Sequence, residues 1–211
     1  MEAPPVRLAG TVLDRKQHIC AFFNSDVEEY RALLPFAREG IEQGDRVVHL
    51  LDPTQREPRR ARFQEAGIDV DAAERTGQLD LRPWQEAYLQ DNCFDQDRML
   101  ALIESFLSSG RDLGFGRTRL WANMEWALED CPGVEQLVEY ESRLNHLLPQ
   151  FGDPVCCTYD LARFDATVVM DILRTHPMVL VGGILAENPY YVEPEVMLQE
   201  LAARKARKSP R

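Results

Sequence analysis

Two residues with metal-binding and acid–base side chains, His18 and Cys20, stand together near the start of the chain in the segment HIC. Residues two apart on a strand point to the same face, so this imidazole and thiol would lie side by side. A zinc ion would need further ligands, and the candidates are Cys156, Cys157, His176 and Glu125. Their spacing matches no recognisable zinc pattern, so we expect no metal site and interpret His18 and Cys20 as strand residues with satisfied side chains.

Phosphate binding is the next chemistry to consider, because an apolar segment HICAFF is followed by a loop and a helical segment. A phosphate-binding loop exposes backbone N–H groups through glycine and supplies a lysine, whereas this loop reads NSDVEEY, without either. Asp26, Glu28 and Glu29 already occupy the electropositive start of the helix. We therefore expect neither ATP nor GTP to bind.

Covalent or acid–base catalysis has one candidate, Glu125, which stands between Met124 and Trp126. A carboxylate among apolar groups has a raised pKa and can accept a proton. The alternative is that Glu125 caps or pairs with a neighbouring helix. The sequence has no GxSxG elbow, and the adjacent Cys156 and Cys157 would face opposite sides of a strand as core residues.

The elements that would position these residues alternate between strands and helices. We predict strands over residues 18–23, 46–51, 79–82, 117–126, 154–160 and 178–185. We predict helices over 25–44, 53–67, 94–110, 132–148, 165–176 and 193–206. This alternation indicates a three-layer α/β domain with a mostly parallel sheet and helices on both faces.

In such a domain, ligands bind beyond the carboxyl ends of the strands. Aromatic, apolar and a few polar residues occur in or just after the predicted strands, and they predict one mostly apolar pocket for a small organic molecule or a protein partner. The candidate ligand-binding residues are His18, Cys20, Phe22, Asn123, Met124, Glu125, Trp126, Tyr159, Asn188 and Tyr190.

Chain length and charge limit the number of domains and the kinds of partner. The 211 residues suffice for one domain, which we place at 16–203 between a polar lead-in (1–15) and a basic tail (204–211). Residues 1–203 carry 19 basic and 35 acidic side chains, a formal charge of −16, which disfavours nucleic acid. We expect that removing residues 1–12 and 204–211 leaves the melting temperature nearly unchanged.

The five cysteines form no CxxC pair, the first ten residues hold no apolar run, and no segment approaches the roughly 20 apolar residues of a membrane span. These features indicate a cytoplasmic protein with reduced thiols and without membrane association.

Three stretches resemble the MEDS domain, a family named for methanogens, methylotrophs and a dichloromethane-responsive regulator. They begin at HICAFFNSDVEEY, LWANMEWAL and CTYDLARFD, and the resemblance runs from about residue 17 to 200. The family's H-x-C motif falls on His18 and Cys20. Its final motif falls on His176, Pro177, Asn188, Pro189 and Tyr190.

The resemblance implies a RecA-like fold that has lost its phosphate loop and acts in bacterial regulators as a non-enzymatic sensor of small hydrocarbon-type ligands, with no cofactor. Family members are commonly joined to output domains, for which we see no room here. We therefore expect a signal to a separate regulatory protein, such as a kinase or an anti-sigma or sigma regulator, with homo-oligomerisation also possible. The alternatives are a protein-interaction module without a ligand and an enzyme that uses His18 and Glu125 as acid and base.

Overall fold

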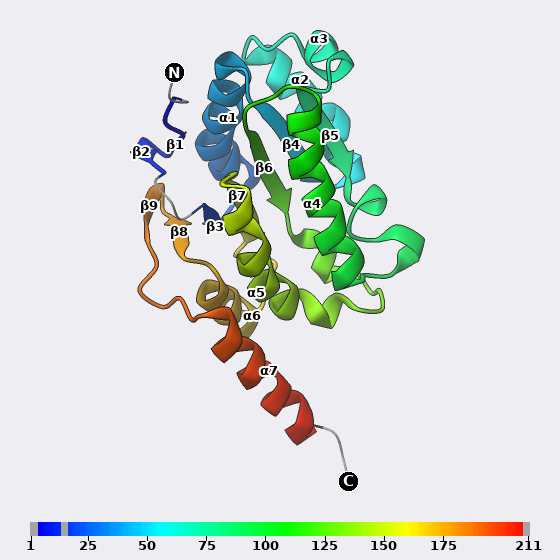
Figure 1. Cartoon of the computed structure of the whole chain (residues 1–211), viewed down its shortest axis with the longest axis vertical. Coiled ribbons are helices and arrows are strands. Elements are labelled where there is room, and N and C mark those ends of the chain that lie inside the picture. The colour runs from blue at the N-terminus through cyan, green and yellow to red at the C-terminus, as the bar shows by residue number, and fades with distance from the viewer. Residues whose placement is uncertain (1–3, 14–16, 209–211) are drawn as a thin grey trace.

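The centre of the molecule is a seven-stranded sheet, seen in the computed structural model, which describes residues 4–13 and 17–208 (Figure 1). In spatial order its strands are β5 (Leu79–Pro83), β4 (Arg46–Leu51), β6 (Thr118–Asn123), β7 (Val155–Asp160), β3 (His18–Phe23), β8 (Met178–Val181) and β9 (Ile184–Glu187). All neighbouring strands pair in parallel except β8 and β9. The predicted α/β class and mostly parallel sheet are thereby confirmed.

Helices cover both faces of this sheet, as the crossover between parallel strands requires. One face is covered by α1 (Asp26–Gln43), α2 (Arg56–Glu65) and α3 (Val70–Arg75), and the other by α4 (Gln96–Asp112), α5 (Leu137–Leu147) and α6 (Ala166–Thr175). The last helix, α7 (Pro194–Lys208), packs against α5 and α6 and then extends away from the body (Figure 1). Short 3₁₀ helices complete the described chain: η1 (Pro53–Gln55), η2 (Trp84–Glu86), η3 (Gln90–Asn92), η4 (Glu125–Leu128), η5 (Val134–Gln136) and η6 (Leu148–Gln150).

Local sequence signals set the boundaries of α1. The Ser25 hydroxyl accepts a hydrogen bond from the backbone N–H of Glu28 at 3.3 Å, which satisfies one of the free donors of the first turn. Gly44 ends the helix with a φ of 79°, a left-handed conformation that glycine adopts without steric cost. Both ends agree with the prediction from sequence.

The predicted single strand over 178–185 is wrong, because the chain reverses within it. β8 and β9 form an antiparallel hairpin, and the turn residues Gly182 and Gly183 have φ values of 56° and 75°. A two-residue turn with both φ values positive matches the twist of a hairpin. The predicted strand over 117–126 likewise ends early, at Asn123, and η4 follows.

The lead-in is more ordered than its polar sequence predicts. Its described part contains a small hairpin of β1 (Arg7–Leu8) and β2 (Thr11–Val12), and Val6, Leu8 and Leu13 are buried against the side of the core that holds α1. Three isolated apolar residues carry no periodicity, so this packing could not be predicted from the sequence. Residues 1–3 and 14–16 of the lead-in lie outside the described residues.

The basic tail is helical through Lys208, and Arg204 forms ion pairs with Asp171 and Glu200. Residues 209–211 of the tail lie outside the described residues. No helix in the described ranges is both long and apolar enough to cross a membrane.

We expect Leu8→Ala to lower the free energy of unfolding by about 2 kcal/mol, because the side chain is only 1% exposed and its removal leaves a cavity against the core. Urea denaturation measures the change. Val12→Ala in the same hairpin is the matched control, since Val12 is 49% exposed, and it should change stability by less than about 0.5 kcal/mol. Equal effects of the two substitutions would mean that the hairpin does not dock. For the same reason, removal of residues 1–12 should destabilise the protein, contrary to the expectation from sequence.

Candidate functional site at the carboxyl ends of the strands

A crevice of about 230 Å³ opens where five parallel strands end. The strands β3, β4, β5, β6 and β7 all reach it at or just after their carboxyl ends, through Phe23, Asp52, Trp84, Asn123 and Asp160. The other lining residues are Ser25, Asp26, Glu29, Gln55, Arg59, Glu125, Thr158, Tyr159 and Arg163. The position agrees with the general rule for ligand sites in open α/β sheets.

Glu29, from the first turn of α1, organises the floor of this crevice. One of its oxygens, Oε1, accepts hydrogen bonds from Trp121 Nε1 (2.8 Å), Asn123 Nδ2 (2.7 Å) and Thr158 Oγ1 (2.9 Å). Its Oε2 lies 3.2 Å from Arg59 Nη2 in a buried ion pair. An internal carboxylate therefore uses the donors that an anionic ligand would need.

Glu125 is the second buried acid of the crevice, and burial raises its pKa to about 7, with the nearby charge of Glu29 adding to the effect. Its Oε1 accepts a hydrogen bond from the backbone N–H of Asp160 at 3.1 Å, which partly opposes the shift. The raised pKa that the sequence predicted for this residue is confirmed. Glu125 therefore gains or loses a proton near neutral pH.

We expect Glu125→Gln to stabilise the protein above pH 7 by about 1 to 3 kcal/mol. Between pH 4.5 and 7 the unfolded chain releases the Glu125 proton while the folded chain retains it, so wild-type stability falls as the pH rises through this range. Glutamine has no proton to lose, so the gap between variant and wild type should be full above pH 7 and should close towards pH 4.5. Urea denaturation from pH 4.5 to 8 measures this, and a gap independent of pH would contradict it.

Polar and charged side chains form most of the crevice lining, which corrects the expectation of a mostly apolar pocket. Five carboxylates line it, from Asp26, Glu29, Asp52, Glu125 and Asp160, against the two cations Arg59 and Arg163. Arg59 is already paired with Glu29 and, at 3.4 Å, with Asp26. The crevice therefore has a negative electrostatic potential, which favours a ligand that donates hydrogen bonds or carries positive charge.

Three of the ten residues predicted to bind a ligand, Asn123, Glu125 and Tyr159, line this crevice. Phe22, Met124 and Trp126 do not, because they are buried in the core between the sheet and helices α4 to α6. Their ligand-binding role stays a prediction that the crevice geometry does not favour.

Asn188 and Tyr190 lie outside the crevice lining as well. Asn188 donates hydrogen bonds from Nδ2 to the carbonyl oxygens of His176 (2.7 Å) and Leu173 (2.5 Å), so it fastens the chain after β9 to the end of α6. The side chain of Tyr190 is 61% exposed.

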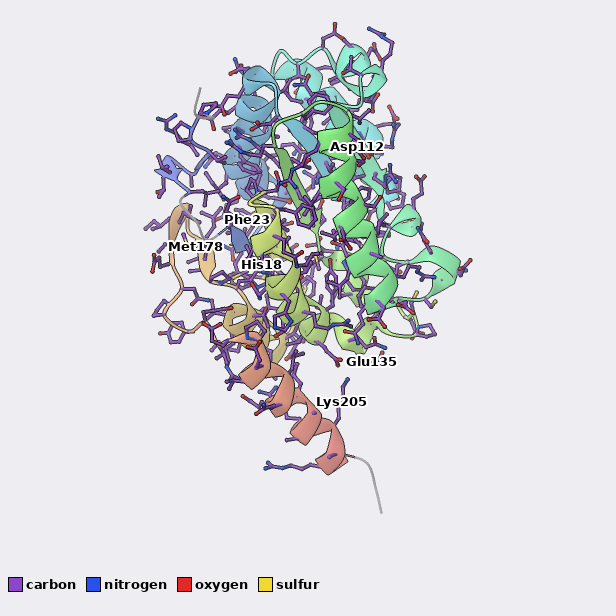
Figure 2. All side chains as sticks on the ribbon, viewed as in Figure 1. His18, Phe23, Asp112, Glu135, Met178 and Lys205 are labelled. Atoms are coloured by element: carbon purple, nitrogen blue, oxygen red, sulfur yellow. The ribbon has the colours of Figure 1, made fainter. Side chains whose placement is uncertain are left out.

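His18 and Cys20 lie far from the crevice because β3 begins, rather than ends, at His18. Five residue steps along the strand separate His18 from Phe23, or about 16 Å. Figure 2 shows His18 near Met178, at the starts of the paired strands β3 and β8. The Cys20 thiol donates to the carbonyl oxygen of Met178 at 3.6 Å.

His18 instead joins a buried cluster under α5. Its Nε2 is 3.2 Å from Glu141 Oε2, and His176 Nε2 is 3.4 Å from the same oxygen. Burial lowers the pKa of His18, and the neighbouring His176 lowers it further. Burial alone would raise the pKa of Glu141, but the two histidines outweigh it and hold that pKa well below its usual range.

The candidate residues predicted from sequence did not include Arg59, Thr158 or Glu141. Glu141 had a usable signal, because it stands on the apolar stripe Leu137, Glu141, Leu144, Leu148 of its helix, where a charge requires a buried partner. Arg59 and Thr158 had none, since their partners are 30 and 129 residues away in sequence.

The mostly parallel sheet with helices on both faces, and with carboxylates in the first turn of α1, makes this an α/β domain, and its likeness to a solved structure shows a RecA-like fold. A KaiC-like protein from the hyperthermophilic archaeon Pyrococcus horikoshii OT3 has this fold, with a TM-score of 0.54, 14% sequence identity, and coverage of 78% of this chain and 70% of that one. The family described as MEDS, the MEthanogen/methylotroph, DcmR Sensory domain, matches residues 17–177, and the chain belongs to this family. Of the motif positions assigned from sequence, Asn188, Pro189 and Tyr190 lie beyond the matched range.

A curated relative, the transcriptional repressor DcmR of Methylorubrum extorquens (strain DM4), is 27% identical over 179 residues. The alignment covers 82% of this chain and 63% of the relative, so the chain spans less than two thirds of that protein's length. The family is described as a sensory domain, and this relative is described as a transcriptional repressor.

Proposed function

We propose that this chain is a non-catalytic sensory domain that binds a small organic molecule in the strand-end crevice and passes the signal to a separate regulatory protein. The observation that carries the proposal is the meeting of five strand ends around one crevice in a member of a sensory family. The crevice volume of about 230 Å³ lies below the roughly 300 to 1,000 Å³ usual for ligand pockets, which favours a small molecule.

The chemistry of the lining refines the class of ligand. A hydrocarbon-type ligand would need an apolar cavity, and the apolar part of this lining is limited to Phe23, Trp84 and the ring of Tyr159. The carboxylates of Asp26 and Glu125 suit a molecule with an amino group or several hydroxyl groups, while the aromatic rings pack on its carbon atoms. We therefore propose a small polar organic ligand, with the positively charged amine as the favoured case.

Native mass spectrometry of the protein purified from its own host tests whether such a molecule is retained. Calorimetric titration then compares a panel of small amines, alcohols and hydrocarbons, with ATP and magnesium as the nucleotide control. We expect amines to bind and ATP not to bind. Binding by the hydrocarbons alone would contradict the polar ligand, and micromolar ATP binding would contradict the sensory crevice.

Two substitutions that each remove a negative charge from α1 test whether the proposed ligand binds in the crevice. Asp26→Asn should weaken amine binding about two- to fivefold, the size of a screened exposed charge pair. Glu42→Gln is the matched control, since its side chain is 58% exposed against 57% for Asp26 but does not line the crevice. Equal affinities of wild type and both variants would place the ligand elsewhere.

A further inference from the structure

A buried cluster of four potential metal ligands lies between the sheet and helices α5 and α6, apart from the crevice. The residues are His18 on β3, Glu141 on α5, Cys157 on β7 and His176 just after α6. All four are buried, and the four ligand atoms lie within 4.8 Å of one another. Four elements distant in sequence thus bring two nitrogens, one oxygen and one sulfur to a single point.

Hydrogen bonds orient both imidazoles. Asn145 donates from Nδ2 to the carbonyl oxygen of Thr175 at 2.7 Å, so its Oδ1 faces His18 Nδ1, at 3.0 Å, as an acceptor. His176 Nδ1 lies 3.0 Å from the carbonyl oxygen of Ile172, which is also an acceptor. Each Nδ1 is thus used in a hydrogen bond that points out of the cluster, and each Nε2 points into it, where it can ligate a metal ion.

This arrangement is that of metal-binding histidines, which donate the outer N–H to a carbonyl and ligate through the other nitrogen. Here both Nε2 atoms converge on the Glu141 carboxylate, which is itself an acceptor. His176 Nε2 finds no hydrogen-bond partner among the described residues despite its proximity to Glu141. Two imidazole nitrogens, one carboxylate oxygen and one thiol sulfur therefore converge on a buried point with the composition of a metal site.

We propose that His18, Glu141, Cys157 and His176 bind a divalent transition-metal ion, with zinc as the preferred species. The closest separations are 3.2 and 3.4 Å from Glu141 to the two histidines, and 3.8 and 3.7 Å from Cys157 Sγ to His18 Nε2 and Glu141 Oε2. Bonds of about 2.0 to 2.3 Å in a tetrahedron place the ligand atoms roughly 3.3 to 3.8 Å apart, so these four pairs already match and the widest pair, within 4.8 Å, must close by about 1 Å.

Charge balance supports the same ion. On binding, the S–H bond of Cys157 breaks, its proton leaves to solvent, and the thiolate forms the metal–sulfur bond. One thiolate, one carboxylate and two neutral imidazoles neutralise a divalent cation, so the loaded centre carries no net charge in its apolar surroundings. The nitrogen and sulfur ligands favour zinc over magnesium or calcium.

The centre is linked to the crevice through one side chain. Tyr159 lines the crevice, and its hydroxyl donates to Glu141 Oε1 at 2.7 Å, an outer-shell contact that orients the carboxylate. The metal centre does not depend on the proposed ligand, because its donor atoms come from the opposite end of β3 and from the helices behind the sheet.

Metal content and cobalt spectroscopy of the full chain test the proposal. Protein produced with zinc in the medium should retain one zinc per chain after gel filtration. Chelator-treated protein titrated with Co²⁺ should show a thiolate-to-cobalt charge-transfer band. Cys157→Ser should abolish this band, and His176→Gln should weaken cobalt binding by at least about 100-fold, more than the loss of an outer-shell partner.

Two buried neighbours on the other face of the sheet provide matched controls. Cys156→Ser and His49→Gln alter a thiol and an imidazole that are equally buried but belong to the α1 side, and they should leave cobalt affinity within about threefold of wild type. Zinc should also raise the melting temperature of wild type and both controls. A folded wild type that binds neither zinc nor cobalt would overturn the proposal, as would loss of the band in Cys156→Ser but not in Cys157→Ser.

Discussion

Replacing Glu29 by alanine is expected to lower the free energy of unfolding by about 3 to 5 kcal/mol. The substitution leaves the buried guanidinium of Arg59 without its main partner, and it removes the acceptor shared by Trp121, Asn123 and Thr158. A buried charge left with only the more exposed Asp26, and the orphaned indole N–H of Trp121, are each costly in a water-poor interior, whereas Asn123 and Thr158 still bond to each other. Urea denaturation at pH 7 measures the loss.

Two further substitutions separate the charge of Glu29 from its position. Glu29→Gln keeps an acceptor oxygen but removes the charge, so its cost should fall between that of alanine and wild type. Glu42→Ala on the exposed side of the same helix should cost less than about 0.5 kcal/mol. If alanine at position 29 costs as little as at position 42, the network does not support the fold.

Trp126→Ala is expected to cost a similar amount, about 3 to 5 kcal/mol, through loss of stability rather than of ligand affinity. The indole is fully buried, stacks on Tyr88 with ring centroids 4.5 Å apart, and lies 4.3 Å from the ring of Phe94. Its removal opens a cavity in the core that the surrounding side chains fill only in part. Thermal and urea unfolding measure the effect.

Tyr190→Ala is the control for Trp126, because it removes another aromatic ring that the sequence placed in the ligand site but that the structure leaves 61% exposed. It should leave stability within about 0.5 kcal/mol of wild type. If Trp126→Ala remained as stable as Tyr190→Ala and lost ligand binding instead, the indole would belong to a ligand pocket after all.

Most element boundaries that depend on neighbouring residues were predicted correctly from the sequence. β3 and β4 occupy the predicted residues 18–23 and 46–51, because each is a mostly apolar run flanked by polar residues. The ends of α1 depend on Ser25 and Gly44 and their immediate neighbours. The hairpin of β8 and β9 was missed although its Gly182–Gly183 turn is a local signal, because the apolar residues on both sides read as one strand.

The candidate site was predicted only in part, for a geometric reason. Asn123, Glu125 and Tyr159 follow or end their strands, so the rule that ligands bind at carboxyl ends selected them correctly for the crevice lining. The same rule does not apply to His18, which begins its strand, or to Trp126, which η4 turns into the core. The sequence does not tell which side of a short helical turn faces inward.

By itself the sequence determined the α/β class, the positions of most strands and helices, the replacement of a phosphate loop by carboxylates, and the family. These depend on apolar runs, turn residues and ordered motifs, which act over a few neighbouring residues. Only the tertiary structure decided that Glu29 is held by Arg59, Trp121 and Thr158, and that His18, Glu141, Cys157 and His176 meet at one buried point. These contacts between distant residues depend on the strand order and on how α5 and α6 pack on the sheet. Because burying an unpaired polar group is costly, each buried polar side chain then pairs with the partners that the fold brings near it.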